Sequence, residues 1–174
     1  MPKIVAAVLV FVCLMLLSIP MSAQLLPRGN VYAGVSYSPQ LTDVAPANKQ
    51  SYRGWEGSAE DLPFVRFPHL GFVIDASGYY RSGVKQYMGV FGPRLSTNIG
   101  KWRPFIDAMA GIRHVNSNNI IIYNPIAIDI GGGVDYKLWF KNFSWRLQGD
   151  FVHSRYASDN QNDYKASTGI VWRF

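Results

Sequence analysis

Few side chains in this 174-residue chain are placed to do chemistry. The histidines are His69, His114 and His153, and their spacing matches no metal-binding motif. His153 and Ser154 are adjacent, so on a β-strand they would point to opposite faces and could not act together as base and nucleophile. The run Gly131 to Gly133 suggests part of a phosphate loop, but no Lys-Ser or Lys-Thr ending follows it. We therefore expect no catalytic, cofactor or metal site.

The charged residues are more informative, because many of them alternate with apolar residues. In "IAIDIGGGVDYKL" the aliphatic residues Ile126, Ile128 and Ile130 alternate with polar or small ones, which is the period of a strand. The charged residues that fall on the opposite face from the apolar ones are Asp75, Asp107, Asp129, Asp135, Asp150, Arg94, Arg113, Arg146, Lys165 and Arg173. Since an isolated buried charge is costly, we expect these side chains to pair inside the fold.

One pair follows from a hairpin register. Gly100-Lys101 suits a two-residue type II′ turn, since that turn takes glycine first. This turn places Arg94 directly opposite Asp107, with both on the polar face. The sequence therefore predicts an Arg94–Asp107 ion pair.

A second pair follows in the same way. A turn at Phe140-Lys141 places Asp135 opposite Arg146, again on the polar face. A shift of one residue would set Lys137 against Arg146, and directly opposed like charges are destabilising. Charge therefore favours the register with an Asp135–Arg146 pair, and we expect the pairs to fill the bore of a narrow barrel.

The first 23 residues are expected to be removed. Met1 to Ala23 has one early lysine, a long apolar run, Pro20 and then small residues, which is typical of a secretory signal peptide cleaved near Ala23. A membrane anchor is the alternative, because the apolar run is long. Cleavage would remove Cys13, the only cysteine, and leave no disulfide. Residues 24–174 are read as one domain.

This mature region has the length and composition of an eight-stranded barrel. A spanning strand needs about 9–11 residues, so eight strands and their turns fit in it. Gly, Tyr, Trp and Phe are frequent and charges are few, which favours strands over helices. The alternating stretches are residues 29–39, 53–62, 69–79, 87–96, 103–114, 126–138, 143–156 and 162–174.

Alternation alone does not say which face meets water. A soluble barrel would turn its apolar face inward, whereas a membrane barrel turns it outward. The polar face here is rich in Gly and Ser, which suits a crowded interior, and the aromatic residues gather near strand ends. We place the amino terminus on the inner side of the membrane and thread eight strands. One expected rim then holds Tyr37, Tyr52, Trp55, Tyr79, Tyr80, Tyr87, Tyr123, Tyr156 and Tyr164, and the other holds Trp102, Trp139, Phe143, Trp145, Trp172 and Phe174. Two aromatic girdles favour a transmembrane barrel.

The expected loops agree with that orientation. The links at Gly100-Lys101 and 138–142 are short, as periplasmic turns are, and those at 40–52, 80–86, 115–125 and 156–163 are longer. The connection Asp61 to His69 is long for a periplasmic turn, and the sequence offers no reason for its length.

These strands resemble a known family. The stretches "FGPRLS", "RPFIDAMAGIRH", "AIDIGGGVDYKL", "RLQGDFVHSRY" and "GIVWRF" are similar to the small eight-stranded outer-membrane β-barrel family, the group that includes the membrane domain of outer-membrane protein A. The resemblance implies an all-β, antiparallel up-and-down transmembrane barrel, located in the outer membrane as a monomer. It also implies that the barrel-assembly machinery reads the last strand, through Tyr164, Ile170, Trp172 and Phe174.

A structural or surface-interaction role is therefore expected, with no enzyme activity. The alternatives are a small-solute channel and a lipid-modifying enzyme of the outer membrane. Outer-membrane lipids are the expected partners, and the candidate contacts with lipopolysaccharide phosphates are Lys49, Arg53, Arg81, Lys85 and Arg155. Ordinary solvated loop charge is the competing interpretation of these five residues. Nucleic acid is not expected as a partner, because the 17 basic residues are scattered along the chain and the chain also holds 11 acidic residues.

Overall fold

The structure is a computed structural model that describes residues 29–42, 49–61, 69–81, 84–117, 120–155 and 160–174. The expected signal peptide and most of the Asp61 to His69 connection lie outside these residues. The strands are β1 (Gly29–Thr42), β2 (Lys49–Asp61), β3 (Leu70–Arg81), β4 (Val84–Ser96), β5 (Trp102–Ser117), β6 (Ile120–Tyr123), β7 (Ile126–Lys137), β8 (Phe143–Arg155) and β9 (Asn160–Arg173).

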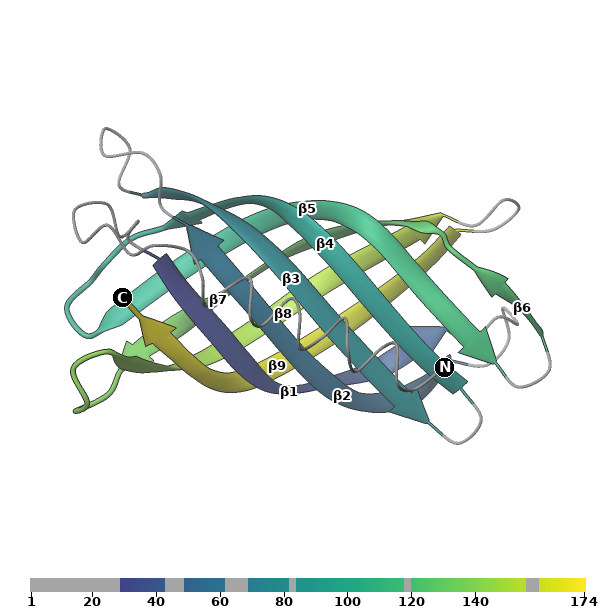
Figure 1. The fold of residues 1–174 in the computed structure, drawn as a ribbon, viewed down its shortest axis with the longest axis horizontal. Helices are drawn as coiled ribbons and strands as arrows, with labels where there is room; N and C mark the ends of the chain where they lie inside the picture. Colours follow the sequence, from purple (N-terminus) through teal and green to yellow (C-terminus); the bar gives the residue numbers. More distant parts are fainter. Residues whose placement is uncertain (1–28, 43–48, 62–68, 82–83, 118–119, 156–159) are drawn as a thin grey trace, which may run out of the picture.

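Eight of these strands form one closed barrel (Figure 1). Each pairs antiparallel with its neighbours in the order β1-β2-β3-β4-β5-β7-β8-β9, and β9 returns to pair with β1. The short strand β6 pairs only with the far end of β5 and extends that wall beyond the barrel. The sequence prediction of an eight-stranded, antiparallel, up-and-down barrel is confirmed.

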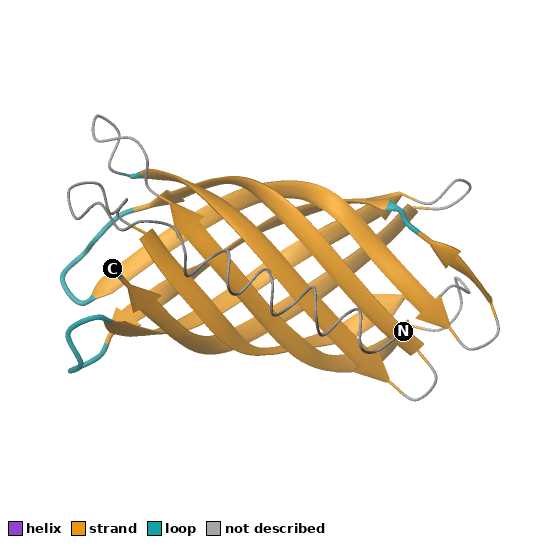
Figure 2. Cartoon of the chain, in the orientation of Figure 1, coloured by secondary structure: helices purple, strands orange, loops and turns teal. Residues whose placement is uncertain are grey.

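The two ends of the barrel differ. Gly29 and Phe174 exchange backbone hydrogen bonds of 3.4 and 3.2 Å, so the first and last strands begin and end together. The 97–101 and 138–142 connections lie at this same end, which we call the turn end (Figure 2). At the opposite end, which we call the loop end, β1, β3 and β8 finish, β2, β4 and β9 start, and β6 lies.

The turn at Gly100 has the expected form. Gly100 has φ of +63°, and Lys101 has a negative φ, which is the combination that a type II′ turn needs. The bridge between Ile99 and Trp102 closes this turn. The predicted register between β4 and β5 follows from it, because Arg94 is opposite Asp107.

The apolar face of the barrel points outward. Ile74, Phe91 and Ile106 are 68%, 66% and 63% exposed, whereas Arg94, Asp135 and Arg146 are fully buried. A water-soluble protein would hide the first three side chains and expose the last three. The exposed aliphatic band and buried charges therefore require a lipid environment around the barrel.

Two aromatic girdles border this band. The exposed aromatic residues toward the loop end include Tyr37, Trp55, Tyr80, Tyr87 and Tyr164, and those toward the turn end include Trp102, Trp139, Phe143, Trp145, Trp172 and Phe174. Tyr52 and Tyr79 were predicted in the first girdle, and this is wrong, because both are buried inside the barrel with Val84 and Val115. Their positions alternate with the outward Arg53 and Tyr80, so strand phase, and not aromatic character, decides their direction.

The four long loops predicted from the sequence are all shorter than expected, and two of them show why. β3 continues to Arg81 and β4 starts at Val84, so only two residues separate them. β5 continues to Ser117, where β6 pairs back onto it. The alternation of apolar and polar residues marks only the part of a strand that crosses the membrane. Backbone pairing between strands continues into the water beyond it, so the strands are longer than the alternation predicts.

Among the described residues, no helix is long and apolar enough to cross a membrane.

A charge on the outer face tests this orientation. Ile128, in β7 and opposite Ala110 and His153, is exposed in the aliphatic band. Ile128→Arg is expected to lower the free energy of unfolding by about 2–4 kcal/mol, because arginine at mid-membrane loses its hydration. The measurement is urea unfolding from phospholipid vesicles. Ser51→Arg, outward but at the loop end of β2, is the control and should unfold as wild type does; equal stability of both variants would contradict the inside-out assignment.

Candidate functional site

The interior of the barrel is the candidate site, because it gathers most of the charged residues of the strands. Every second position of each strand points inward, and these positions carry small, polar, charged and some apolar side chains. The buried acidic residues are Glu56, Glu60, Asp75, Asp107, Asp129, Asp135, Asp150 and Asp163, and the buried basic ones are Arg94, Arg103, Arg113, Arg146 and Lys165.

The first group of ions surrounds Arg94. Its Nη2 lies 2.6 Å from Asp107 Oδ2 and its Nε donates a hydrogen bond of 2.8 Å to the same oxygen. The structure therefore brings together the two residues that the β4–β5 register pairs. Glu60 also belongs to the group, since its Oε2 is 3.5 Å from Arg94 Nη1 and its Oε1 is 2.7 Å from Arg103 Nη2.

The second group surrounds Asp135. Arg146 donates to it from Nε at 2.7 Å and from Nη2 at 3.1 Å, which is a bidentate pair. The structure therefore also brings together the second pair expected from sequence. Arg173 adds a third bond, from Nη2 to Oδ2 at 3.0 Å. The Arg146 guanidinium also lies over the rings of Tyr32 and Phe105, at 4.9 and 4.6 Å from their centroids.

The third group is centred on Lys165 and joins five strands. Its Nζ lies 2.9 Å from Asp129 Oδ2, 3.5 Å from Asp150 Oδ2, 3.6 Å from Glu56 Oε2 and 3.8 Å from Asp75 Oδ1. One ammonium group thus faces four carboxyl groups, all of them buried. Of these, only Asp150 is opposite Lys165 in a neighbouring strand.

Sequence reasoning missed this convergence. It placed Lys165 and the three aspartates on the inner face but did not bring them together, and it did not single out Glu56, Glu60 or Arg103. Hairpin register was the available signal, and it relates only adjacent strands. The β8–β9 register would have found the Lys165–Asp150 pair, whereas Glu56 lies in β2, which does not pair with β9.

The glycine run in β7 makes room for Asp150, which belongs to the ion group around Lys165, and for other neighbouring groups. A Cβ atom at Gly131 would collide with the Asp150 carboxyl group, and one at Gly133 would collide with the Leu147 carbonyl and the Phe105 ring. The glycine run therefore allows close packing of β7 against neighbouring side chains and backbone. A phosphate loop is the wrong interpretation, because the run lies inside a paired strand.

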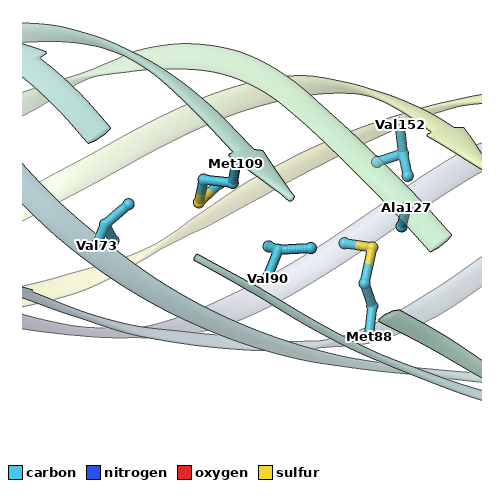
Figure 3. Close-up of a cluster of buried hydrophobic side chains, with 6 residues drawn as sticks. All are labelled: Val73, Met88, Val90, Met109, Ala127 and Val152. Atoms are coloured by element: carbon cyan, nitrogen blue, oxygen red, sulfur yellow. The ribbon is translucent and has the colours of Figure 1, made fainter. Parts of the chain in front are cut away.

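Apolar side chains share the interior with the ions. Figure 3 shows a buried cluster whose members come from β3, β4, β5, β7 and β8: Val73, Met88, Val90, Met109, Ala127 and Val152. Toward the loop end, Arg113 Nη1 contacts Asp163 Oδ2 at 2.6 Å. The bore thus contains ion groups and an apolar cluster, which is the filling expected for eight strands.

The candidate lipopolysaccharide contacts are only partly grouped. Arg53, Tyr80 and Lys85 are consecutive partners across β2, β3 and β4, so they form a row on the outer face. Arg81 is exposed next to Tyr80, but its guanidinium lies over the ring of the buried Tyr52, 5.9 Å from the centroid. Arg155 is exposed on β8, away from this row. The side chain of Lys49 lies outside those that the structure describes.

The four residues of the expected assembly signal share one face. Tyr164, Ile170, Trp172 and Phe174 are all exposed on the outer side of β9 or just after it. The rings of Trp172 and Phe174 are in contact, with centroids 5.3 Å apart. Their recognition by the assembly machinery stays a prediction.

The histidines make ordinary contacts. Each ring nitrogen Nδ1 contacts a nearby oxygen: His69 that of Ser96, His114 that of Asn124 and His153 that of Asn162. Ser154 is fully buried inside the barrel, whereas His153 is partly exposed, so the two point to opposite faces. In the part of the chain that the structure describes, no group of three or more His, Cys, Asp or Glu residues is arranged to hold a metal ion.

No protein-family model matches this chain, and no curated protein matches its sequence. Its fold does match solved structures. Neisserial surface protein A superposes with a TM-score of 0.63 at 14% identity, covering 84% of this chain and 97% of that one. The N-terminal β-barrel domain of OprF from Pseudomonas aeruginosa gives 0.58 at 15% identity, covering 84% and 97%.

A third match is Ail, the attachment invasion locus protein of Yersinia pestis, with a TM-score of 0.52 at 14% identity over 85% of this chain and 99% of that one. Ail has also been solved in complex with the heparin analogue sucrose octasulfate. Identities this low establish the fold alone. This chain therefore has the fold of the small eight-stranded outer-membrane β-barrels, with the exposed aliphatic band and aromatic girdles that a membrane requires.

Proposed function

We propose that this barrel acts as a monomeric structural or surface-interaction protein with a lumen closed to solutes, and that it is not an enzyme. The ion groups carry this proposal. Asp107 and Asp135 pair with arginines of neighbouring strands. Glu60, Asp135 and Lys165 also contact side chains from strands that do not pair with their own. A solute would have to break several buried ion pairs to pass, and separated buried charges are costly.

Planar-bilayer recording tests the closed lumen. The wild-type protein is expected to give no stable conductance steps, because the interior polar groups bind one another rather than a column of water. Heat-modifiable migration on gels verifies that the reconstituted protein is folded. Steady, well-defined steps from folded protein would move it to the alternative function of a small-solute channel.

The proposal that the protein is not an enzyme rests on the geometry of His153 and Ser154. A lipid-modifying enzyme would need its base and its nucleophile on one lipid-facing surface, and these two residues point to opposite faces. Mass spectrometry of lipid A from cells with and without the protein is the test. A mass change that depends on the protein would establish the enzyme alternative.

We further propose that the outer face at the loop end contacts lipopolysaccharide phosphates. The row Arg53, Tyr80 and Lys85 supports this, because it sets two cations at the level of the aromatic girdle, where Tyr80 and Tyr87 also meet edge to face. Headgroup phosphates lie at that depth. The sulfated sugar seen on Ail shows a polyanion bound to a barrel of this fold, although that contact is Ail's own.

Co-purification measures this contact. Changing Arg53, Arg81 and Lys85 together to serine is expected to lower the lipopolysaccharide that remains with the detergent-purified barrel at least severalfold. Arg155→Ser, on a separate part of the surface, is expected to change it little. Unchanged retention in the triple variant would leave solvated loop charge as the correct interpretation.

A further inference from the structure

The turn end of the barrel has a cavity whose charged lining is entirely basic. The cavity has a volume of about 300 Å³ and lies between the Gly100 turn, the 138–142 turn and the end of β9. Its lining includes Lys101, Arg103, Lys137, Lys141, Ser144 and Arg173, and the remaining lining residues are uncharged. We propose that this cavity is a binding site for a phosphate group, either free or on a lipid.

The backbone holds the parts of the cavity in fixed positions. Lys137 N donates to Lys101 O at 2.8 Å, which ties the end of β7 to the Gly100 turn. Arg173 N donates to Asn142 O at 2.8 Å, which ties the end of β9 to the second turn. Three separate chain segments are therefore joined into one frame that keeps the cationic side chains together before any ligand arrives.

The positive charge of the three lysines in the cavity is not neutralised within the described structure. No carboxylate of the described residues lies within 4.0 Å of the ammonium groups of Lys101, Lys137 and Lys141. The nearest buried acids are already bound, since Glu60 contacts Arg94 and Arg103, and Asp135 contacts Arg146 and Arg173. A concave surface of one sign raises the local concentration of counter-ions.

The lining also supplies hydrogen-bond donors. Arg173 Nε is buried without a hydrogen-bond partner among the described residues, although Nη2 of the same guanidinium bonds to Asp135. A buried donor without an acceptor is unfavourable, and an oxyanion would satisfy it. The amide of Asn142 and the hydroxyl of Ser144 add uncharged donors. Charged and forked donors of this kind suit phosphate oxygens.

The level of the cavity in the membrane fits a lipid headgroup as well as a free anion. Trp139 and Phe140 lie in the 138–142 turn and are 100% and 72% exposed. Exposed aromatic side chains at a barrel rim sit at the headgroup level. The phosphate could therefore belong to an anionic lipid such as phosphatidylglycerol or to a soluble phosphate ester, and both present the same oxyanion to the cavity.

The decisive variant changes Lys101, Lys137 and Lys141 together to serine. All three side chains are exposed and none has an ion pair in the described structure, so the barrel is expected to fold, which heat-modifiable migration checks. The matched control changes the same three residues to arginine, which keeps the charge. Both are compared with the full wild-type barrel at low ionic strength, because salt screens exposed charges.

Two measurements distinguish the sources of phosphate. Calorimetric titration with glycerol 3-phosphate, in phosphatidylcholine nanodiscs, measures the soluble ligand. Native mass spectrometry from mixed phosphatidylglycerol and phosphatidylcholine micelles counts retained anionic lipid. We expect saturable binding in at least one measurement, at least a tenfold loss of affinity or retention in the serine variant, and retention of binding in the arginine variant. Absence of binding by wild type in both measurements, or equal binding by the serine variant, would overturn the proposal.

Discussion

Replacing Lys165 with methionine is expected to destabilise the barrel more than any other single substitution considered for this protein. Lys165 is the one cation within 4 Å of Glu56, Asp75 and Asp129 among the described residues, and it also contacts Asp150. Removing one member of a buried ion pair costs about 3–5 kcal/mol, because the opposite charge is left uncompensated. Here four carboxyl groups would remain together, so the loss should reach at least the upper part of that range.

Urea unfolding from phospholipid vesicles, followed by gel migration, measures this loss. Lys85→Met is the matched control, since it removes an exposed lysine from the outer surface of β4 and should leave the free energy of unfolding nearly unchanged. Where the Lys165→Met barrel does not fold at all, a second variant that adds Asp129→Asn and Asp150→Asn is expected to restore folding. Asparagine keeps the shape of both side chains and removes two of the uncompensated charges.

A barrel with Lys165→Met that is as stable as wild type would show that the carboxyl groups do not need this ammonium group. The third ion group would then have no structural importance, and the closed lumen would rest on the other two. Failure of the added asparagines to rescue folding would attribute the defect to lost packing around the lysine stem instead.

The second large effect is expected for Asp135→Ala. This aspartate neutralises Arg146, which is fully buried, and also binds Arg173. Without it, the Arg146 guanidinium would keep only its ring contacts with Tyr32 and Phe105. We expect a loss of about 3–5 kcal/mol in the free energy of unfolding, since a buried arginine cannot be deprotonated to escape the cost.

Asp61→Ala is the matched control for this substitution. Asp61 is also an aspartate near the turn end of a strand, but its side chain is exposed, so its removal should cost little. The double variant Asp135→Ala with Arg146→Met is expected to recover part of the loss, because no buried charge remains at the centre of that group. A loss of similar size for Asp61→Ala would contradict the explanation by burial.

An ion pair could be predicted from the sequence only where its two residues lie in the two strands of one hairpin. Arg94 and Asp107 are separated by one short hairpin, so the turn at Gly100 sets their register, and the same reasoning connects Asp135 with Arg146. Glu60 reaches Arg94 across two strand pairings, and Arg173 reaches Asp135 from β9. Contacts of this second kind depend on the diameter and tilt of the closed barrel, which no hairpin determines.

Tyr52 and β6 illustrate the other limits of the sequence. Tyr52 is aromatic and near a strand end, which favours a girdle, but the phase of β2 turns its ring into the bore. β6 is too short to stand out, and it exists because β5 extends past the membrane and offers it an edge.

The sequence by itself determined that the chain forms an antiparallel barrel, which face of each strand is apolar, and which charges oppose each other across two hairpins. These properties depend on local alternation with a period of two and on turn chemistry, both of which are written in neighbouring residues. Only the tertiary structure decided that Lys165 meets four carboxyl groups and that Lys101, Lys137 and Arg173 line one basic cavity. The first grouping needs β9 to close on β1, because closure brings Lys165 near Glu56 of β2 and Asp75 of β3. The second needs the ends of β5, β7, β8 and β9 to lie side by side at one rim.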